Sequence, residues 1–460
     1  MKNYKIFGLG LWLTVAIACD KKLDVKPAQD ISSDVALSTP ENIQNVLVGT
    51  YQRAGRSDSY GGRLQLLGDL YGASNQISWI GTFQQPREVF NKALLANNSF
   101  VSGYWLNAYA LINMANLIID HIHVVEDADE QARILGEAKF LRALTYFDLV
   151  RFFGLPYEAG QPNDQLGVPL MLQGVLDYSG DLTIARSTVG EVYEQVIADL
   201  NEAYDSLPEE NDVFADKYAA KALLARVYLQ QGNYAEARDA ADDVIENSGR
   251  SLTGSFAGAF NNDENSAEDL FAIQVTSQDG TNQLIIHYAD QDHGGRAGDV
   301  VVEDEYLALF DSGSDVRASF FYESADNGER LTSKYTNQFG NISVIRLAEM
   351  YLIRAESNFR LGTAVGASPV ADINEVRRRS NASQKLVVTL NDILLERELE
   401  LAFEGFLIHD VKRLRRAITI TENQGQTTLE YDSGRLIYPI PERETDVNPL
   451  LVQNDYYQAN

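Results

Sequence analysis

Residues 216–247 have the sequence DKYAAKALLARVYLQQGNYAEARDAADDVIEN, which predicts a hairpin of two helices. The small side chains of Ala225 and Ala237 allow the two helices to approach closely. Tyr228 and Tyr234 are then placed to fill the seam between them. This stretch therefore predicts a body built from packed helix pairs.

The hairpin is similar to a tetratricopeptide unit, with the pattern Lys221-x-x-Leu224-Ala225-x-x-Tyr228 followed by Gly232-x-Tyr234-x-x-Ala237. A looser second copy covers 348–362, with Ala355 at the small position. Units of this kind stack on one another, so we expect a short solenoid of helices.

The flanking sequence predicts more helices, at 104–123, 130–153, 187–207 and, as a pair broken at Gly405, 390–418. Thr39 before Pro40 is typical of a helix start, and Thr188 with Glu191 resembles a capping box. By contrast, 55–98 is rich in Gly, Ser, Asn and Gln and is predicted to be irregular and exposed. Residues 250–340 lack the helical period, contain one predicted strand at 270–275, and include a predicted loop at 280–299.

The predicted fold is therefore mainly α. A tetratricopeptide-like helical-hairpin scaffold, at about 39–250 and 341–420, holds a loop-rich, partly β insert at about 251–340. No segment of disordered composition divides 39–460, so we expect a single domain.

The composition of the 460 residues is that of a globular protein, with 45% hydrophobic and 23% charged residues. Asp and Glu number 66 against 38 Lys and Arg, which gives a formal net charge of −28. A surface this acidic repels phosphate backbones, so nucleic acid is excluded as a partner.

The N-terminus, MKNYKIFGLGLWLTVAIAC, has two lysines, then an uncharged apolar run, then small residues before Cys19. The run is too short to span a membrane and predicts a signal peptide over 1–18. The ending VAIAC resembles a bacterial lipobox, in which the cysteine is acylated and becomes the mature N-terminus. Cys19 is the only cysteine, so it cannot form an internal disulfide. We expect a lipid on Cys19 and a tether over 19–38.

Motifs for catalysis or cofactors are missing. There is no phosphate-binding loop, and Gly254 to Gly258 lacks the spacing of a nucleophile elbow. His121 and His123 are two residues apart on a predicted helix and do not share a face, so we predict no metal site. Four glutamates are predicted to be surface or ion-paired residues rather than catalytic acids: Glu396, Glu398, Glu400 and Glu404. We expect neither an enzyme nor a cofactor.

Two loops combine aromatic rings with polar side chains, which is the chemistry that holds sugars: a ring face packs on C–H groups while charged groups bond hydroxyls. The first loop contributes the candidate ligand residues Tyr60, Arg63, Asp69, Tyr71, Trp79 and Phe83. The second contributes Tyr288, Asp292, His293 and Arg296. The alternative is that the aromatic rings fix the loops to the helices. Trp105, within a helical stripe, is predicted to be core.

Several segments together resemble the SusD/RagB family of outer-membrane nutrient-binding lipoproteins. In order along the chain they are CDKKLD (19–24), WLNAYALINMAN (105–116), AKFLRALTYFDLVRFFGLP (138–156), GVPL (167–170), RLAEMYLIRAE (346–356), INEVR (373–377), ERELELAFEG (396–405) and PIPERETDVNP (439–449). The motifs span nearly the whole mature chain. One departure is that two lysines follow Asp20, where family members often carry more acid.

The resemblance implies a mostly helical body with four tetratricopeptide-like units, and a ligand site in the variable loops. It also implies a lipid-anchored location on the cell surface at the outer membrane, no catalysis, and pairing with a SusC-like TonB-dependent transporter, on which the protein acts as a hinged lid. We therefore expect a lipoprotein that binds a glycan, an oligo- or polysaccharide, and delivers it to the transporter. The alternatives are a peptide-binding member of the same family and, with nothing in the sequence to favour it, a surface glycoside hydrolase.

Overall fold

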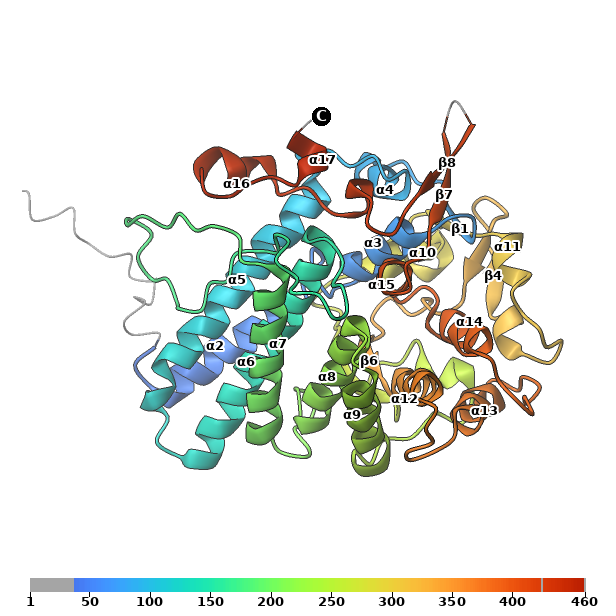
Figure 1. The fold of residues 1–460 in the computed structure, drawn as a ribbon, viewed down its shortest axis with the longest axis horizontal. Helices are drawn as coiled ribbons and strands as arrows, with labels where there is room; N and C mark the ends of the chain where they lie inside the picture. Colours follow the sequence, from blue (N-terminus) through green and yellow to red (C-terminus); the bar gives the residue numbers. More distant parts are fainter. Residues whose placement is uncertain (1–36, 423–424, 459–460) are drawn as a thin grey trace, which may run out of the picture.

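The computed structural model describes residues 37–422 and 425–458, so Cys19, the signal peptide and most of the tether lie outside the described residues. The body is a row of helices in which each packs on the next (Figure 1). In order they are α2 (Pro40–Ala54), α5 (Ser99–His121), α6 (Ala128–Phe153), α7 (Val189–Ser206), α8 (Lys217–Gln231), α9 (Tyr234–Asn247) and α12 (Leu347–Leu361). The prediction of a mainly α fold is confirmed.

The predicted hairpin at 216–247 is confirmed as α8 and α9. Gly232 ends α8 in the left-handed conformation, with φ of 78°, which glycine adopts without steric cost. Ala225 and Ala237 are both fully buried where the helices meet. Helix α12, in the predicted second copy, packs on α9 and continues the row.

Helix α7 begins with the predicted capping box. Thr188 accepts the backbone N–H of Glu191, and the Glu191 carboxylate accepts the N–H of Thr188. Replacing Thr188 with alanine leaves one of these N–H groups without an acceptor, so we expect the free energy of unfolding to fall by about 1 kcal/mol. Urea unfolding followed by circular dichroism measures the change. Thr188→Ser is the matched control and should unfold like the wild type, whereas equal losses in both variants would contradict the role of the cap.

The remaining helices are short and connect or flank the helices of the row (Figure 1). Those of α type are α3 (Arg63–Gly72), α4 (Gln84–Phe90), α10 (Gln283–Tyr288), α11 (Asp304–Leu307), α13 (Pro369–Arg379), α14 (Leu390–Leu401), α15 (Leu407–Arg413), α16 (Glu442–Val447) and α17 (Asp455–Gln458). Short 3₁₀ turns occur at η1 (Ile122–Val124), η2 (Phe256–Ala259), η3 (Gln291–His293), η4 (Val316–Ser319) and η5 (Gly434–Leu436). Within the described ranges, no helix is both long and apolar enough to cross a membrane.

The strands form antiparallel pairs rather than one sheet. The pairs are β1 (Ile77–Trp79) with β3 (Val300–Val302), β2 (Asp269–Ile273) with β6 (Ile342–Arg346), β4 (Phe321–Glu323) with β5 (Arg330–Thr332), and β7 (Ile418–Glu422) with β8 (Gly425–Leu429). Strand β2 confirms the strand predicted at 270–275. The predicted helix end at residue 418 is wrong, because Ile418 and Ile420 are buried on alternate positions of β7.

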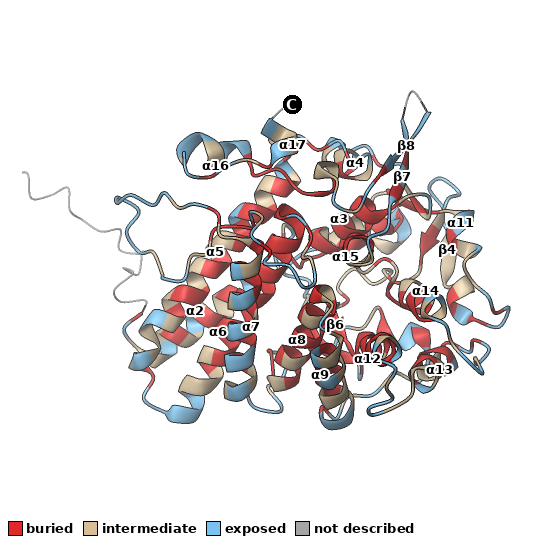
Figure 2. Cartoon of the chain, viewed as in Figure 1, coloured by how far each residue is buried: buried red, intermediate tan, exposed pale blue. Residues whose placement is uncertain are grey.

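The prediction that 55–98 is irregular and exposed is also wrong, since this segment contains α3, β1 and α4. After Arg63, every residue of α3 is buried, so its sequence shows no polar face and no helical period. The loop predicted at 280–299 likewise contains α10. Figure 2 shows buried residues concentrated in the interior of the molecule, where α5 packs on α6 and α6 contacts α8. Trp105 is buried there, as predicted.

The glutamates of α14 and the turn after it are ion-paired, as predicted, but most are not at the surface. Glu396 pairs with Arg317 at 2.7 Å and with Arg377 at 2.8 Å. Glu400 pairs with Arg346 at 2.6 Å, and Glu404 pairs with Arg346 at 2.7 Å and with Lys334 at 2.6 Å. Glu398, nearer the surface, lies 3.5 Å from Arg416. The remaining carboxylates are thus bonded inside the molecule. Glu400 and Glu404 bond to Arg346 at the end of β6, and Glu396 bonds to η4 and α13.

Candidate functional site

The three candidate tyrosines are buried, and their hydroxyl groups form hydrogen bonds inside the molecule. Tyr60 donates to Asp148 on α6 at 2.7 Å. Tyr71 donates to the carbonyls of Arg435 and Ile437, and Tyr288 donates to Asp69 at 3.1 Å. The expectation that these rings are exposed is therefore wrong. The alternative, that the rings fix the loops to the helices, describes Tyr60, whereas Tyr71 and Tyr288 bond to residues outside the helical row.

Four other candidates come together from three separate parts of the chain. Trp79 is the last residue of β1, and Phe83 lies just before α4. Arg63 is the first residue of α3, and Arg296 lies after η3. They meet Phe100 and His287, and we call these six residues the aromatic–arginine cluster: Arg63, Trp79, Phe83, Phe100, His287 and Arg296. In Figure 1 the cluster lies where β1, α4 and α10 meet.

His287 is the centre of the cluster. Its ring centroid lies 5.5 Å from that of Trp79, 6.0 Å from that of Phe83 and 6.5 Å from that of Phe100. Its Nδ1 lies 2.8 Å from Oδ2 of Asp299, which fixes the ring. Burial lowers the pKa of His287 although Asp299 acts in the opposite direction, so the imidazole is neutral at neutral pH.

The outer part of the cluster is a ring face beside two cations. The Arg296 guanidinium carbon lies 4.0 Å from the ring centroid of Phe83, and that of Arg63 lies 3.8 Å from the ring of Phe100. Arg296 also donates to the Thr82 hydroxyl at 2.9 Å and pairs with Asp299 at 3.3 Å. Phe83 remains 38% exposed and the neighbouring Ile80 46% exposed. Part of the Phe83 ring is thus available to solvent, although the Arg296 guanidinium lies over it.

The backbone at Gly81 allows this arrangement. A Cβ atom there would lie 2.6 Å from the Trp79 ring and 2.6 Å from Oδ1 of Asp299. The turn after β1 therefore requires glycine to pass over the indole. The antiparallel pairing of Trp79 with Val300 places Asp299 beside this turn, and the Ile80 N–H donates to the Asp299 carbonyl.

Asp292 and His293 lie on η3, which Asp290 caps. Asp292 is exposed, whereas His293 is half-buried and lies 2.6 Å from Oδ1 of Asp290. The ring of His293 packs on Tyr322 of β4 at 4.8 Å between centroids, rather than on His287. These two candidates therefore form a second polar surface next to the cluster.

Asp69 lies inside the molecule, 3% exposed, at the wall of a separate pocket. Sequence reasoning did not include Phe100, His287 and Asp299 among the candidates. Little in the sequence indicated these residues. His287 occurs in an apolar run, and Asp299 comes close only through the pairing of β1 with β3, which joins residues over 200 positions apart. For 37–422 and 425–458, no group of three His, Cys, Asp or Glu side chains is arranged to hold a metal ion.

Comparison with known proteins shows the family. A model described as starch-binding and associating with the outer membrane matches residues 21–229, and the model of the SusD family matches 316–457. A SusD-like protein from Formosa agariphila is 28% identical, with 99% of each chain covered. The starch-binding protein SusD from Bacteroides thetaiotaomicron is 24% identical over 83% of this chain and 80% of its own. The chain belongs to the SusD/RagB family.

Solved structures agree with this assignment. A SusD superfamily protein from Bacteroides thetaiotaomicron superposes with a TM-score of 0.81 at 27% identity, covering 90% of this chain and 99% of its own. A putative sugar binding protein from Bacteroides vulgatus gives a TM-score of 0.80 at 25% identity, covering 91% and 99%. The mainly helical, single-domain fold is that of the superfamily.

Proposed function

We propose that this chain is a cell-surface lipoprotein that binds an oligo- or polysaccharide at the aromatic–arginine cluster and delivers it to a TonB-dependent outer-membrane transporter. The observation on which the proposal rests is the exposed ring of Phe83 beside the Arg296 guanidinium. Support also comes from the names of the relatives, among them a starch-binding protein.

The chemistry of the cluster suits a sugar. A pyranose ring presents C–H groups that pack on an aromatic face, while its hydroxyls bond to charged donors. Phe83 offers the face, and Arg296 and the Thr82 hydroxyl offer the polar groups. His287, which packs on Trp79, lies against Phe83 and holds it in position, so little side-chain entropy remains to be lost on binding.

The delivery role rests on the family and on the N-terminal sequence. A diacylglycerol on Cys19, the first residue of the tether, would keep the helical body at the membrane surface beside a transporter. The protein then acts as a hinged lid that closes with its glycan-binding surface towards the barrel.

Replacing Phe83 with alanine removes the exposed ring face, so we expect glycan binding to weaken by about 1–2 kcal/mol, roughly five- to thirtyfold in Kd. A glycan array would first identify the ligand, and isothermal titration calorimetry would then give the Kd of each variant. Phe359→Ala is the matched control, because Phe359 on α12 is 37% exposed against 38% for Phe83 but lies outside the cluster.

The control should bind like the wild type. Equal affinities for wild type and Phe83→Ala would remove the cluster from the site. A peptide pool belongs in the same screen, since binding of peptides and of no glycan would establish the peptide-binding alternative.

A further inference from the structure

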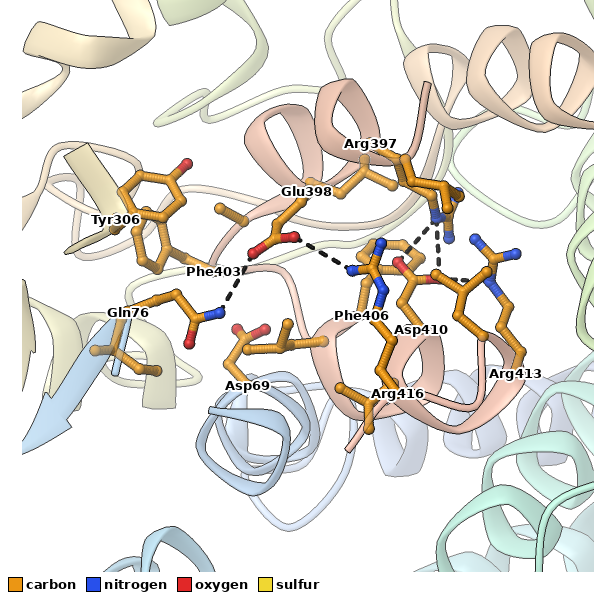
Figure 3. A pocket seen from close by; sticks show the side chains of 17 residues that line it. Asp69, Gln76, Tyr306, Arg397, Glu398, Phe403, Phe406, Asp410, Arg413 and Arg416 are labelled. Carbon is orange, nitrogen blue, oxygen red and sulfur yellow. Dashed lines mark hydrogen bonds and ion pairs between the residues drawn. The ribbon is translucent and has the colours of Figure 1, made fainter. Parts of the chain in front are cut away.

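A pocket begins at the start of β1, and no residue of the aromatic–arginine cluster lines it (Figure 3). Its walls come from α3, β1, α11, α14 and α15, and it contains about 620 Å³ of space between atoms, including the part open to solvent. Most of the lining is apolar, with residues such as Ile77, Leu401, Phe403, Phe406 and Val411.

The polar groups of the pocket are paired, with one exception. Glu398 accepts from Gln76 at 3.4 Å and pairs with Arg416 at 3.5 Å, close to the opening (Figure 3). Deeper in the pocket, Asp410 pairs with Arg397 at 3.0 Å and with Arg413 at 2.6 Å. These contacts leave the charges of five of the six ionisable groups compensated inside the pocket or at its edge.

Asp69 is the exception. Its Oδ2 accepts the Gly405 N–H at 3.0 Å and the Tyr288 hydroxyl at 3.1 Å. In the part of the chain that the structure describes, no Lys, Arg or His nitrogen lies within 4.0 Å of this carboxylate, and Oδ1 has no hydrogen-bond donor. A buried carboxylate without a cation is costly when ionised, so the pocket offers a site for a positive charge.

We propose that this pocket binds a compact hydrophobic amine, whose ammonium group pairs with Asp69 and whose apolar part fills the space between Phe403, Phe406 and Leu401. Aromatic faces accept a cation as well as an apolar chain, so the wall suits both ends of such a ligand. The proposal does not depend on glycan binding, because no residue of the aromatic–arginine cluster lines this pocket.

The ionisation of Asp69 gives the site a pH dependence. Burial raises the pKa of Asp69 to about 7, although the hydrogen bonds from Gly405 and Tyr288 act in the opposite direction. The titratable and charged groups around it are Tyr288, Lys334, Tyr335, Glu398 and Glu404. An alkylammonium stays charged throughout this range, so its affinity should rise about tenfold from about pH 6 to about pH 8, as Asp69 loses its proton.

The test uses isopentylamine as the probe and isopentanol as its neutral counterpart of the same shape, titrated into the purified protein and followed by NMR. Asp69→Asn keeps the acceptor for Gly405 and Tyr288 but removes the charge. We expect it to weaken amine binding at least tenfold at about pH 8, to abolish the pH dependence, and to leave isopentanol and glycan binding unchanged.

A second variant keeps the test decisive if Asp69→Asn does not fold, as judged by circular dichroism. Leu414 is a half-buried residue of the lining, and Leu414→Phe should fill the pocket and reduce binding of both probes. Glu398→Gln is the control acid at the opening and should change amine affinity less than about threefold.

The proposal is overturned if the wild type shows no saturable binding of the amine, or if folded Asp69→Asn binds it as tightly as the wild type. Loss of glycan binding in Phe83→Ala would leave this result unaffected.

Discussion

Replacing Glu400 with glutamine is expected to lower the free energy of unfolding by about 3–5 kcal/mol, the largest effect that we predict for a single side chain. Glu400 is fully buried, and its carboxylate pairs with Arg346 at 2.6 Å, with Arg317 at 3.2 Å and with Arg379. Glutamine has nearly the same shape but no charge. The substitution therefore leaves three buried guanidinium groups short of one negative charge.

The pKa of Glu400 indicates whether burial or the neighbouring positive charges have the larger effect on the carboxylate. Burial raises it, but the positive charges of Arg379, Arg346 and Arg317 outweigh burial and hold it well below its usual range. A carboxylate with a lowered folded pKa stabilises the protein above its unfolded pKa, and that stability is lost as the pH falls through the folded value. The wild type should thus lose this contribution in acid, whereas Glu400→Gln should lack it at every pH.

Urea unfolding at neutral pH measures the difference. Glu375→Gln is the matched control, since Glu375 pairs with Arg378 on the exposed side of α13, where the side chains are 42% and 56% exposed. Exposed pairs contribute little, so we expect a change below about 1 kcal/mol. Similar losses in the two variants would contradict the view that the buried pairs stabilise the junction of α14 and β6.

Replacing Gly68 with alanine is expected to lower the free energy of unfolding by about 3 kcal/mol, near the upper end of what overpacking costs. A Cβ atom at Gly68 would lie 2.4 Å from the Gly405 carbonyl oxygen, which is backbone and cannot rotate away. In an open helix the same change would be favourable by about 1 kcal/mol. Here α3 must instead move away from the turn between α14 and α15.

The unfolding midpoint in urea again provides the measurement. Gly180→Ala is the control, because a Cβ atom there meets nothing within 4 Å. We expect the control to unfold like the wild type. If Gly68→Ala also did, the close approach of α3 to Gly405 would not determine how these elements pack.

Helices such as α2, α7 and α9 could be predicted from the sequence because each buries one face, which leaves a period of 3.6 residues. Local patterns also predicted two helix starts, at Thr39 and Thr188. The pattern of the helix hairpin likewise predicted the close packing at Ala225 and Ala237. Helix α3 could not be predicted in this way, since a helix buried on every side shows no period. The residues before it, Gly61 and Gly62, suggested a loop. Gly61 instead lies so close to the backbone of residues 55–56 that a side chain would not fit.

The site was partly predictable for a similar reason. Residue chemistry identified Trp79, Phe83, Arg63 and Arg296, which the structure brings together. It could not separate the exposed Phe83 from Trp79, which is buried, or from Tyr60, Tyr71 and Tyr288, whose hydroxyls bond inside the molecule. Which ring is exposed depends on tertiary contacts such as the pairing of Trp79 with Val300, and no local pattern records those.

A crystal structure of the protein with the glycan that an array identifies would test the central claim most directly. We predict a sugar ring packed on the exposed face of Phe83, with a hydroxyl bonded to Arg296. A glycan bound elsewhere would contradict the account. One such place is the groove between α2 and residues 272–282, whose walls include Tyr51 and Phe214.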